Sequence, residues 1–307
     1  MLSPKPWKLE AVVRLLLKLF ICMCAGWLLI GVLSAKVQPE QGRGKLIGLA
    51  ILAALCLAVA FILLHKSWTI QNFLSRAITT LAVFYVGLVL TAWAQHLAGA
   101  LTGTPSVLQM VIAMVSLQGA AIVLVTLFLK EQGSSWREGF GFSNHTGRAI
   151  LIGIVVVGLF IPIGYLLQAV IGKAVEYFTH DRVAQQEVVK TIHETSPGLH
   201  RLVLGILTLV LAPLGEETLF RGILYTATRQ AGFPRTALWL TSIVFAGFHI
   251  NFATGILSQT PVLVPLFILG LTLAILYEKT DNLLAPMAAH IAFNMFGFIG
   301  TLLSGSA

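Results

Sequence analysis

Charged residues and cysteines are both scarce in this chain of 307 residues. Lys, Arg, Asp and Glu together make up 10% of it, whereas they make up roughly 25% of a soluble domain. The three cysteines, Cys22, Cys24 and Cys56, are an odd number and lie inside apolar stretches. These shortages exclude a soluble globular enzyme, and they argue against a disulfide scaffold or a cysteine-based zinc knuckle.

Apolar residues are abundant instead, at 57% of the chain. A helix needs about 20 apolar residues to cross a bilayer, and candidate spans of about that length recur along the sequence. They cover residues 12–34, 46–64, 77–96, 107–129, 149–171, 202–227, 236–257, 262–278 and 283–303. The sequence therefore predicts an all-α fold, a polytopic transmembrane bundle of about eight to nine spans.

The domain prediction is a single membrane domain over residues 1–307. No internal repeat, linker or low-complexity run interrupts it. The N-terminal helices, residues 1–171, carry no recognisable motif, whereas residues 200–303 carry most of the polar chemistry.

The net charge of +8 comes from basic residues scattered among short loops. No basic stripe or aromatic-basic repeat is present, which excludes nucleic acid as a partner. The lipid bilayer, with its anionic headgroups, is the expected partner. Lys and Arg are more frequent on the segments that would share a side with the N-terminus, which places the N-terminus in the cytoplasm. The short loops favour the inner membrane of a prokaryotic cell.

Polar residues gather within the apolar segments of the last third of the chain. A single charge near the centre of a bilayer costs about 2.5–3.5 kcal/mol on insertion scales, so such residues are functional candidates by default. They are Glu216, Glu217 and Arg221 in segment 202–227, His249 in segment 236–257, and His290 and Asn294 in segment 283–303.

Helical spacing predicts which of these residues share a helix face and a depth in the membrane. Glu217 and Arg221 are four residues apart and share a helix face, whereas Glu216 points about 100° away from Glu217. One carboxylate can then be held by the arginine while the other remains for chemistry. Counted along their helices, Glu216, His249, His290 and Asn294 all reach a similar depth near mid-membrane. This convergence predicts one buried site.

The residue types suggest a reaction. A carboxylate and a histidine can activate water as a general base, and a second histidine with an amide can stabilise an oxyanion. Together these groups suit hydrolysis of a peptide bond by activated water. No Gly-x-Ser-x-Gly nucleophile elbow is present. A zinc ion held by two histidines and a glutamate is the alternative, although no His-Glu-x-x-His motif supports it.

Three motifs carry a family resemblance. Residues 216–221 match Glu-Glu-x-x-x-Arg, residues 245–249 match Phe-x-x-x-His, and residues 290–294 match His-x-x-x-Asn. In this order they resemble the CAAX prenyl protease and bacteriocin-processing (CPBP, abortive-infection) family of intramembrane endopeptidases. Eukaryotic members of that family remove the last three residues of prenylated CAAX proteins. The resemblance implies an intramembrane endopeptidase that cleaves near the C-terminus of a membrane-anchored or prenylated, CAAX-like substrate.

The resemblance also implies a role for each catalytic position. Glu216 corresponds to the general base that activates water, with His249 assisting it. His290 and Asn294 correspond to the oxyanion site.

Supporting roles follow in the same way. Glu217 and Arg221 would orient the first glutamate and brace the helix, and Phe245 would pack beside His249, within reach of a substrate. Both metal-dependent and metal-free mechanisms are discussed for the family. If zinc is bound, the implied ligands are Glu216, His249 and His290.

Two readings compete with the protease. A non-catalytic membrane scaffold, or an immunity or regulatory protein of the same fold, would keep its function when the glutamates are replaced. A proton-coupled transporter could also use buried Glu and His residues as a relay. It would, however, be expected to show inverted repeats, and the polar residues avoid the first half of this chain.

Overall fold

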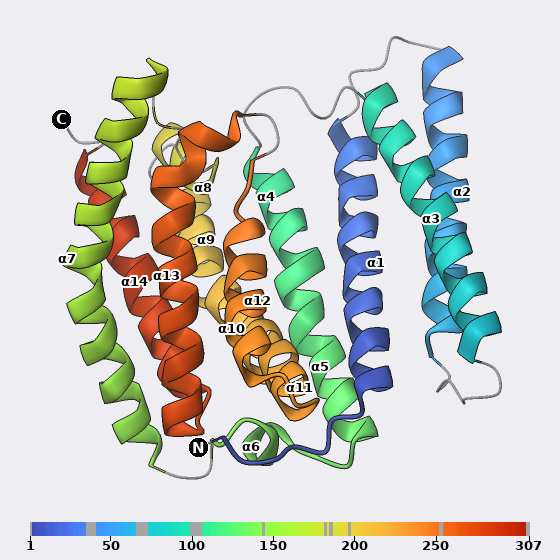
Figure 1. Ribbon diagram of the computed structural model, residues 1–307. Coiled ribbons are helices and arrows are strands. Elements are labelled where there is room, and N and C mark those ends of the chain that lie inside the picture. Colours follow the sequence, from blue (N-terminus) through green and yellow to red (C-terminus); the bar gives the residue numbers. More distant parts are fainter. Residues whose placement is uncertain are drawn as a thin grey trace. The chain divides into compact units, whose positions relative to one another are not determined.

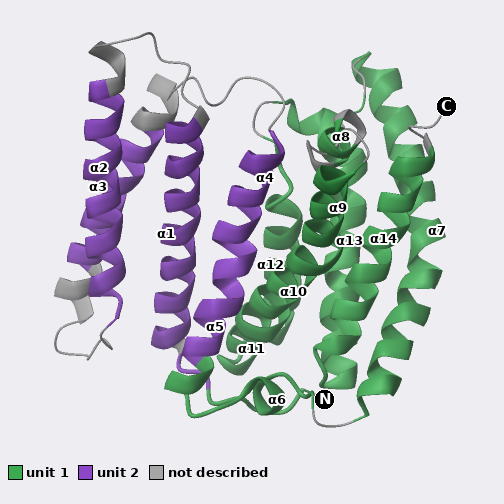
Figure 2. Ribbon diagram, turned by 180° about the vertical axis from the view of Figure 1, so that it is seen from behind, with its two compact units in different colours: residues 1–6, 129–307 green, residues 7–128 purple. Residues whose placement is uncertain are grey.

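The computed structural model describes residues 2–34, 41–65, 73–98, 106–142, 145–180, 183, 187–195, 198–251 and 254–304. Within these ranges the regular elements are all helices, and no strand is found (Figure 1). This confirms the predicted all-α fold. The chain divides into two compact units, which are residues 7–128 and residues 1–6 together with 129–307 (Figure 2). That the two units act as one membrane domain stays a prediction.

The unit of residues 7–128 is built from long apolar helices. Helix α2 packs along α3, and α1 contacts both. The one deeply buried cation of this unit that the structure describes is Arg14, whose Nε lies 2.5 Å from the carboxylate of Glu10. The elements are α1 (Leu9–Ser34), α2 (Gln41–Leu63), α3 (Phe73–Ala98), α4 (Val107–Met114), the π-helical η1 (Val115–Gly119) and most of α5 (Ala120–Glu131).

The second unit holds all three motifs. Its long helix α7 packs against both α13 and α14, and α12 packs against α13 (Figure 1). The elements are α6 (Trp136–Gly139), α7 (Thr146–Thr179), α8 (Glu187–Glu194), α9 (Leu199–Ile206), η2 (Leu207–Leu211), α10 (Ala212–Glu217), η3 (Thr218–Tyr225), α11 (Thr226–Gln230), α12 (Pro234–Gly247), α13 (Ile256–Thr280) and α14 (Leu284–Ser304).

Seven helical stretches of the described residues are long and apolar enough to cross a membrane, and a shorter apolar stretch, Ile78–Ala92, lies in α3. The predicted span over residues 236–257 is wrong at its end, because α12 stops at Gly247. Two backbone hydrogen bonds of the i→i+3 type, His249 N to Ala246 O and Ile250 N to Gly247 O, turn the chain there. The next span is longer than predicted, since α13 already begins at Ile256.

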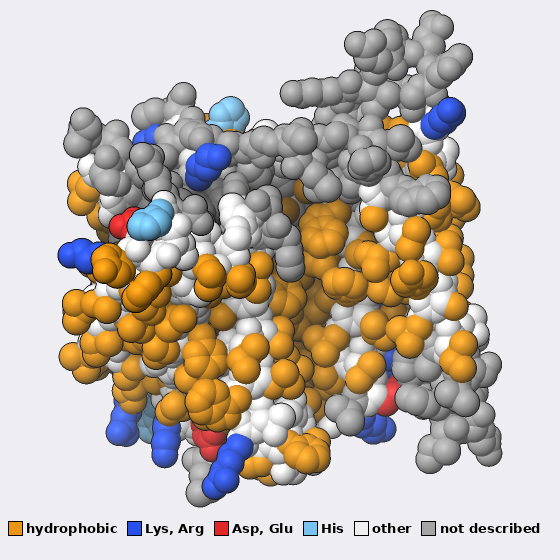
Figure 3. All heavy atoms as spheres, turned by 45° about the horizontal axis from the view of Figure 1, so that its top comes forward, with side chains coloured by type: hydrophobic (Ala, Val, Ile, Leu, Met, Phe, Trp, Pro, Cys, Tyr) orange, Lys and Arg blue, Asp and Glu red, His pale blue; other side chains and the backbone are white. Residues whose placement is uncertain are grey.

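The outer faces of these helices are apolar. On α7, Leu159, Ile163 and Leu166 are each more than 60% exposed. Figure 3 shows hydrophobic side chains over most of the visible described surface, with Lys and Arg toward its edges. Large exposed apolar areas of this kind suit contact with lipid rather than water. Together with the seven apolar helices, they indicate an integral, multi-pass membrane protein.

Close packing of α7 on α14 depends on a residue without a side chain. A Cβ atom added to Gly153 would lie 2.2 Å from the carbonyl oxygen of Ala285 on α14. Small residues let membrane helices approach in this way, because van der Waals contact drives their association. The site residues of α14 therefore sit at a depth and rotation that Gly153 helps to set.

Replacing Gly153 by alanine should push α7 away from α14. Overpacking of a filled interface typically costs about 1–3 kcal/mol, so a lower midpoint of thermal or detergent-induced unfolding is expected. Gly158→Ala is the matched control, because its added Cβ would meet no atom within 4 Å. Equal midpoints for the two variants would contradict the close approach.

Candidate active site

The three motifs converge inside the unit of residues 1–6 and 129–307. The paired glutamates end α10, and Arg221 lies in the π-helical turn η3 that follows directly. His249 lies just beyond the end of α12, and His290 lies on α14. Wide π-helical turns are frequent at functional sites.

Glu217 is the centre of the cluster. Its side chain is fully buried, and its Oε1 accepts hydrogen bonds from Arg221 Nη1 and His290 Nδ1, each at 2.8 Å. A buried charge is tolerated only when it is paired and hydrogen-bonded. One carboxylate oxygen therefore joins the first motif to the third, although 73 residues separate Glu217 from His290 in sequence.

Arg221 is fully buried as well, and its two terminal nitrogens bond to neighbouring groups. Its Nη2 donates to the carbonyl oxygen of Gly270 on α13 at 3.0 Å. The backbone approaches closely there, since a Cβ on Gly270 would lie 3.1 Å from Ser242 of α12. The guanidinium also lies over the Phe245 ring, 4.5 Å from its centroid, where the π face attracts a cation. Arg221 thus ties η3 to α12 and α13.

Glu216 has a different environment from Glu217. Its side chain retains 16% exposure, and its Oε2 lies 3.9 Å from His290 Nε2. The imidazole of His290 is therefore placed between the two carboxylates. An ionised carboxylate can only accept, so the contact with Glu217 requires a proton on Nδ1 and turns Nε2 toward Glu216. The Glu216 side chain is thus less deeply buried than that of Glu217.

His249 is held by its own helix end. Its Nδ1 lies 2.9 Å from the carbonyl oxygen of Phe245, one turn back. A carbonyl only accepts, so this contact places the proton on Nδ1 and leaves Nε2 of the neutral ring as an acceptor. The ring is half-buried.

Phe245 holds both histidines in place. It is completely buried, and its ring makes edge contacts with His249 and His290 at centroid distances of 5.2 and 5.6 Å. Phe220 packs on it at 5.6 Å. Because its ring touches both histidines and Arg221, Phe245 acts in the packing of the site; its part in substrate binding stays a prediction.

Asn294 lies one turn beyond His290 on α14. Its Nδ2 donates to the carbonyl oxygen of Thr208 at 3.0 Å. Thr208 belongs to η2, a π-helical turn in which the i→i−4 hydrogen-bond ladder of an α-helix is interrupted. The amide group therefore supports the neighbouring helix with one N–H and retains a second.

One supporting residue escaped the sequence analysis. Gln259 is 5% exposed, and its side chain binds the backbone that follows His249. Its Oε1 accepts from Asn251 N at 2.7 Å, and its Nε2 donates to Asn251 O and Thr254 O at 2.9 and 3.1 Å. Gln259 lies just outside the predicted span 262–278 and so resembled a loop residue. The feature that could have identified Gln259 is a polar side chain directly before an apolar segment.

The described residues do not provide a set of zinc ligands. Among the described residues, no group of three or more His, Cys, Asp or Glu side chains is placed to hold a metal ion. A zinc site needs three or four such ligands converging on one point. Glu216, His249 and His290 do not form that geometry, so we derive no step through a metal.

Comparison with known proteins bears on the same segment. Residues 198–296 match the family model described as "Type II CAAX prenyl endopeptidase Rce1-like", which confirms the family resemblance of the three motifs. The uncharacterized protein YpbD of Bacillus subtilis is 39% identical over 84 residues, 27% of this chain and 38% of that protein. An uncharacterized 24.3 kDa protein of Escherichia coli is 31% identical over 103 residues, 32% of this chain and 44% of that protein.

These alignments span less than half the length of either relative. No solved structure matches the chain significantly. The family match covers the segment that holds the three motifs.

Removing the buried cation should expose how far the cluster depends on it. Arg221→Met leaves Glu217 as a buried charge without its partner, and such a loss typically costs about 3–5 kcal/mol. Arg235→Met is the matched control, since Arg235 is exposed at the start of α12. Unfolding midpoints of both variants are the measurement.

A double-mutant cycle sharpens this test. With Glu217→Gln also present, the cost of Arg221→Met should fall, because the stranded charge is gone. Strictly additive losses would show that the two side chains are not coupled.

Proposed function

Residues 198–296 belong to the Rce1-like family of type II CAAX prenyl endopeptidases, and on that premise we propose that this chain is an intramembrane endopeptidase. The observation that carries the proposal is the unequal environment of the adjacent glutamates. Glu217 is locked between Arg221 and His290, while Glu216 remains partly exposed beside His290. A general base needs an environment like that of Glu216, because it must come within hydrogen-bonding distance of the water it deprotonates.

In the proposed reaction Glu216 takes a proton from the attacking water. His249 assists through Nε2, which its bond to Phe245 leaves as an acceptor. The water oxygen adds to the scissile carbonyl carbon, and the proton is passed to the leaving amine. Two acceptors at different positions can orient one water more tightly than a single carboxylate.

His290 and Asn294 stabilise the developing oxyanion. Asn294 can donate its second amide N–H. His290 can donate from Nε2 only in its doubly protonated form, since Nδ1–H is directed at Glu217. In that form, with both glutamates ionised, its charge and that of Arg221 would balance the two carboxylates. Glu217 thus acts mainly as a positioning residue for His290, in addition to its ion pair with Arg221.

The proposed substrate is a peptide or lipidated membrane protein cut near its C-terminus. Support comes from the family description and from the first and third motifs, which lie on helices long and apolar enough to cross a membrane. A prenylated, CAAX-like substrate is the specific form that the family suggests. The proposed location is the inner membrane of a prokaryotic cell, with the N-terminus in the cytoplasm.

Glu216→Gln should abolish cleavage of a quenched fluorescent farnesylated CAAX peptide by the purified protein. Loss of a general base costs about 10²–10⁴-fold in rate, while the shape of the side chain is kept. Glu176→Gln, an exposed glutamate on α7, is the control for the same chemical change. Wild-type activity in the Glu216 variant would overturn the assignment of Glu216 as the general base.

The same assay distinguishes a metal-free from a metal-dependent mechanism, and it tests whether the substrate must be prenylated. Activity that survives a zinc chelator supports the metal-free mechanism, and activity lost with the chelator and regained with zinc supports the metal-dependent one. The unprenylated version of the peptide shows whether the farnesyl group is required.

Asn294→Ala tests the oxyanion site. If Asn294 donates to the transition state, kcat should fall about 10²–10³-fold with little change in KM. A purely structural role through Thr208 would instead lower the unfolding midpoint and leave the kcat of the folded fraction near the wild-type value.

A further inference from the structure

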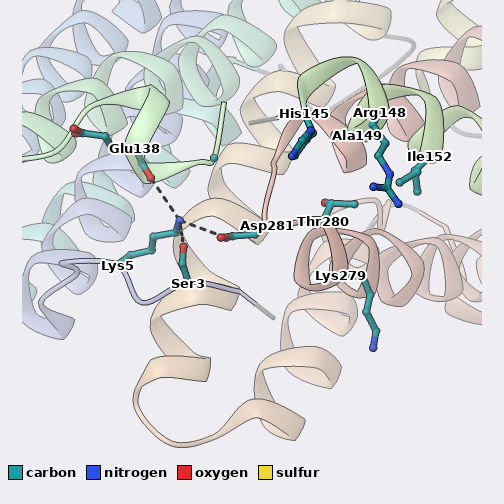
Figure 4. A pocket seen from close by; sticks show the side chains of 11 residues that line it. Ser3, Lys5, Glu138, His145, Arg148, Ala149, Ile152, Lys279, Thr280 and Asp281 are labelled. Atoms are coloured by element: carbon teal, nitrogen blue, oxygen red, sulfur yellow. Dashed lines mark hydrogen bonds and ion pairs between the residues drawn. The ribbon is translucent and has the colours of Figure 1, made fainter. Parts of the chain in front are cut away.

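A polar cavity separate from the motif cluster lies in the unit of residues 1–6 and 129–307, at the ends of two spans. Its volume is about 560 Å³. It is lined by the N-terminal segment, the turn after α6, the start of α7 and the end of α13 (Figure 4). None of the proposed catalytic residues lines it.

The two acidic residues of this cavity are already engaged. Lys5 Nζ lies 3.5 Å from Asp281 Oδ1, and it donates to Ser3 Oγ at 2.7 Å. The Glu138 carboxylate accepts from the backbone N and Oγ of Ser135 at 3.2 and 3.0 Å. In Figure 4 the side chain of Glu138 points away from Lys5, which contacts only its backbone carbonyl.

Two further cations line the cavity. Neither Arg148 nor Lys279 forms an ion pair with any residue that the structure describes. His145, at the start of α7, lines the same cavity. The first turn of α7 contains no acidic residue, so the positive end of a 34-residue helix adds to the potential. The cavity is therefore lined by three cations (Lys5, Arg148 and Lys279) and two carboxylates, which leaves one positive charge in excess.

The position of the cavity favours an amphiphilic anion. Arg148 lies at the start of the span Thr146–Thr179, and Lys279 lies at the end of the span Ile256–Thr280. Both are thus at the level of the lipid headgroups. The wall continues into Ile152, beside the exposed apolar residues Leu151 and Val155 of α7. A bound molecule would meet cations at the membrane boundary and an apolar face directly beyond them.

We propose that this cavity binds the phosphate of an anionic phospholipid headgroup. Arg148 suits the phosphate oxygens because its guanidinium can donate two parallel hydrogen bonds. Lys279 adds a second positive charge, and Ile152 with its apolar neighbours receives the start of the acyl chain. Lys5 takes a positioning role, since it neutralises Asp281, which would otherwise repel the phosphate.

The test measures binding of a short-chain phosphatidylglycerol to the full chain in detergent by isothermal titration calorimetry. Each basic residue at an anionic surface is worth roughly a fivefold change in affinity, so Arg148→Gln and Lys279→Gln should each weaken binding about that much. Arg235→Gln is the control, because it removes an exposed cation outside the cavity. Unfolding midpoints of the unliganded variants should match the wild type.

Three outcomes decide the proposal. Weaker binding by the two cavity variants, with unchanged affinity in the Arg235 variant and poor binding of short-chain phosphatidylcholine, supports it. Equal affinity in all four proteins overturns it. Inorganic phosphate that binds as tightly as the lipid would assign the cavity to free phosphate and overturn the lipid. None of these results depends on protease activity.

Discussion

A single buried carboxylate organises the motif-bearing unit. Glu217 has no access to solvent, and its Oε1 receives hydrogen bonds from both Arg221 and His290. A charge in such surroundings must be paired, because the alternative is an uncompensated ion in a low-dielectric interior. The helix that carries the glutamates, the π-helical turn that follows it and α14 are therefore held in one relative position. The remaining site contacts are built around that position.

The pairing of Arg221 extends this constraint to two further helices. Its second nitrogen reaches Gly270 O on α13, and its guanidinium lies on Phe245 of α12. Phe245 in turn packs against His249 and His290. The helices approach closely where Arg221 meets α13, since a Cβ atom at Gly270 would lie 3.1 Å from Ser242. Packing on Phe245 therefore holds both imidazoles, and the ion pairs place His290 beside Glu216.

The two polar regions of the unit use charge in opposite ways. At the motif cluster, positive and negative groups face each other in the interior, and the excess acid is Glu216. At the cavity near Arg148, the acids are engaged elsewhere and the excess charge is positive. The first arrangement suits proton transfer, and the second suits retention of an anion at the membrane boundary. Separating them keeps the basic residues from neutralising the proposed general base.

The all-α membrane fold and the identity of the clustered residues could be predicted from the sequence, because both depend on local properties. A span requires only about 20 consecutive apolar residues, and the i,i+4 spacing alone places Arg221 beside Glu217. The end of α12 at Gly247 was not predictable in this way. Apolar residues continue past it. The chain turns there through backbone bonds, and Gln259, eight residues beyond Asn251, bonds the backbone of Asn251.

The tertiary structure decided which partner each polar group has. Spacing along the helices indicated a shared depth for Glu216, His249, His290 and Asn294, but depth does not specify contacts. The fold directs His290 Nδ1 to Glu217, Asn294 to Thr208 O and Lys5 to Asp281. These contacts join residues distant in sequence, and they follow from how helices rotate and approach one another when they pack. The sequence by itself determined which groups had to be buried together; only the packed helices determined which atoms meet.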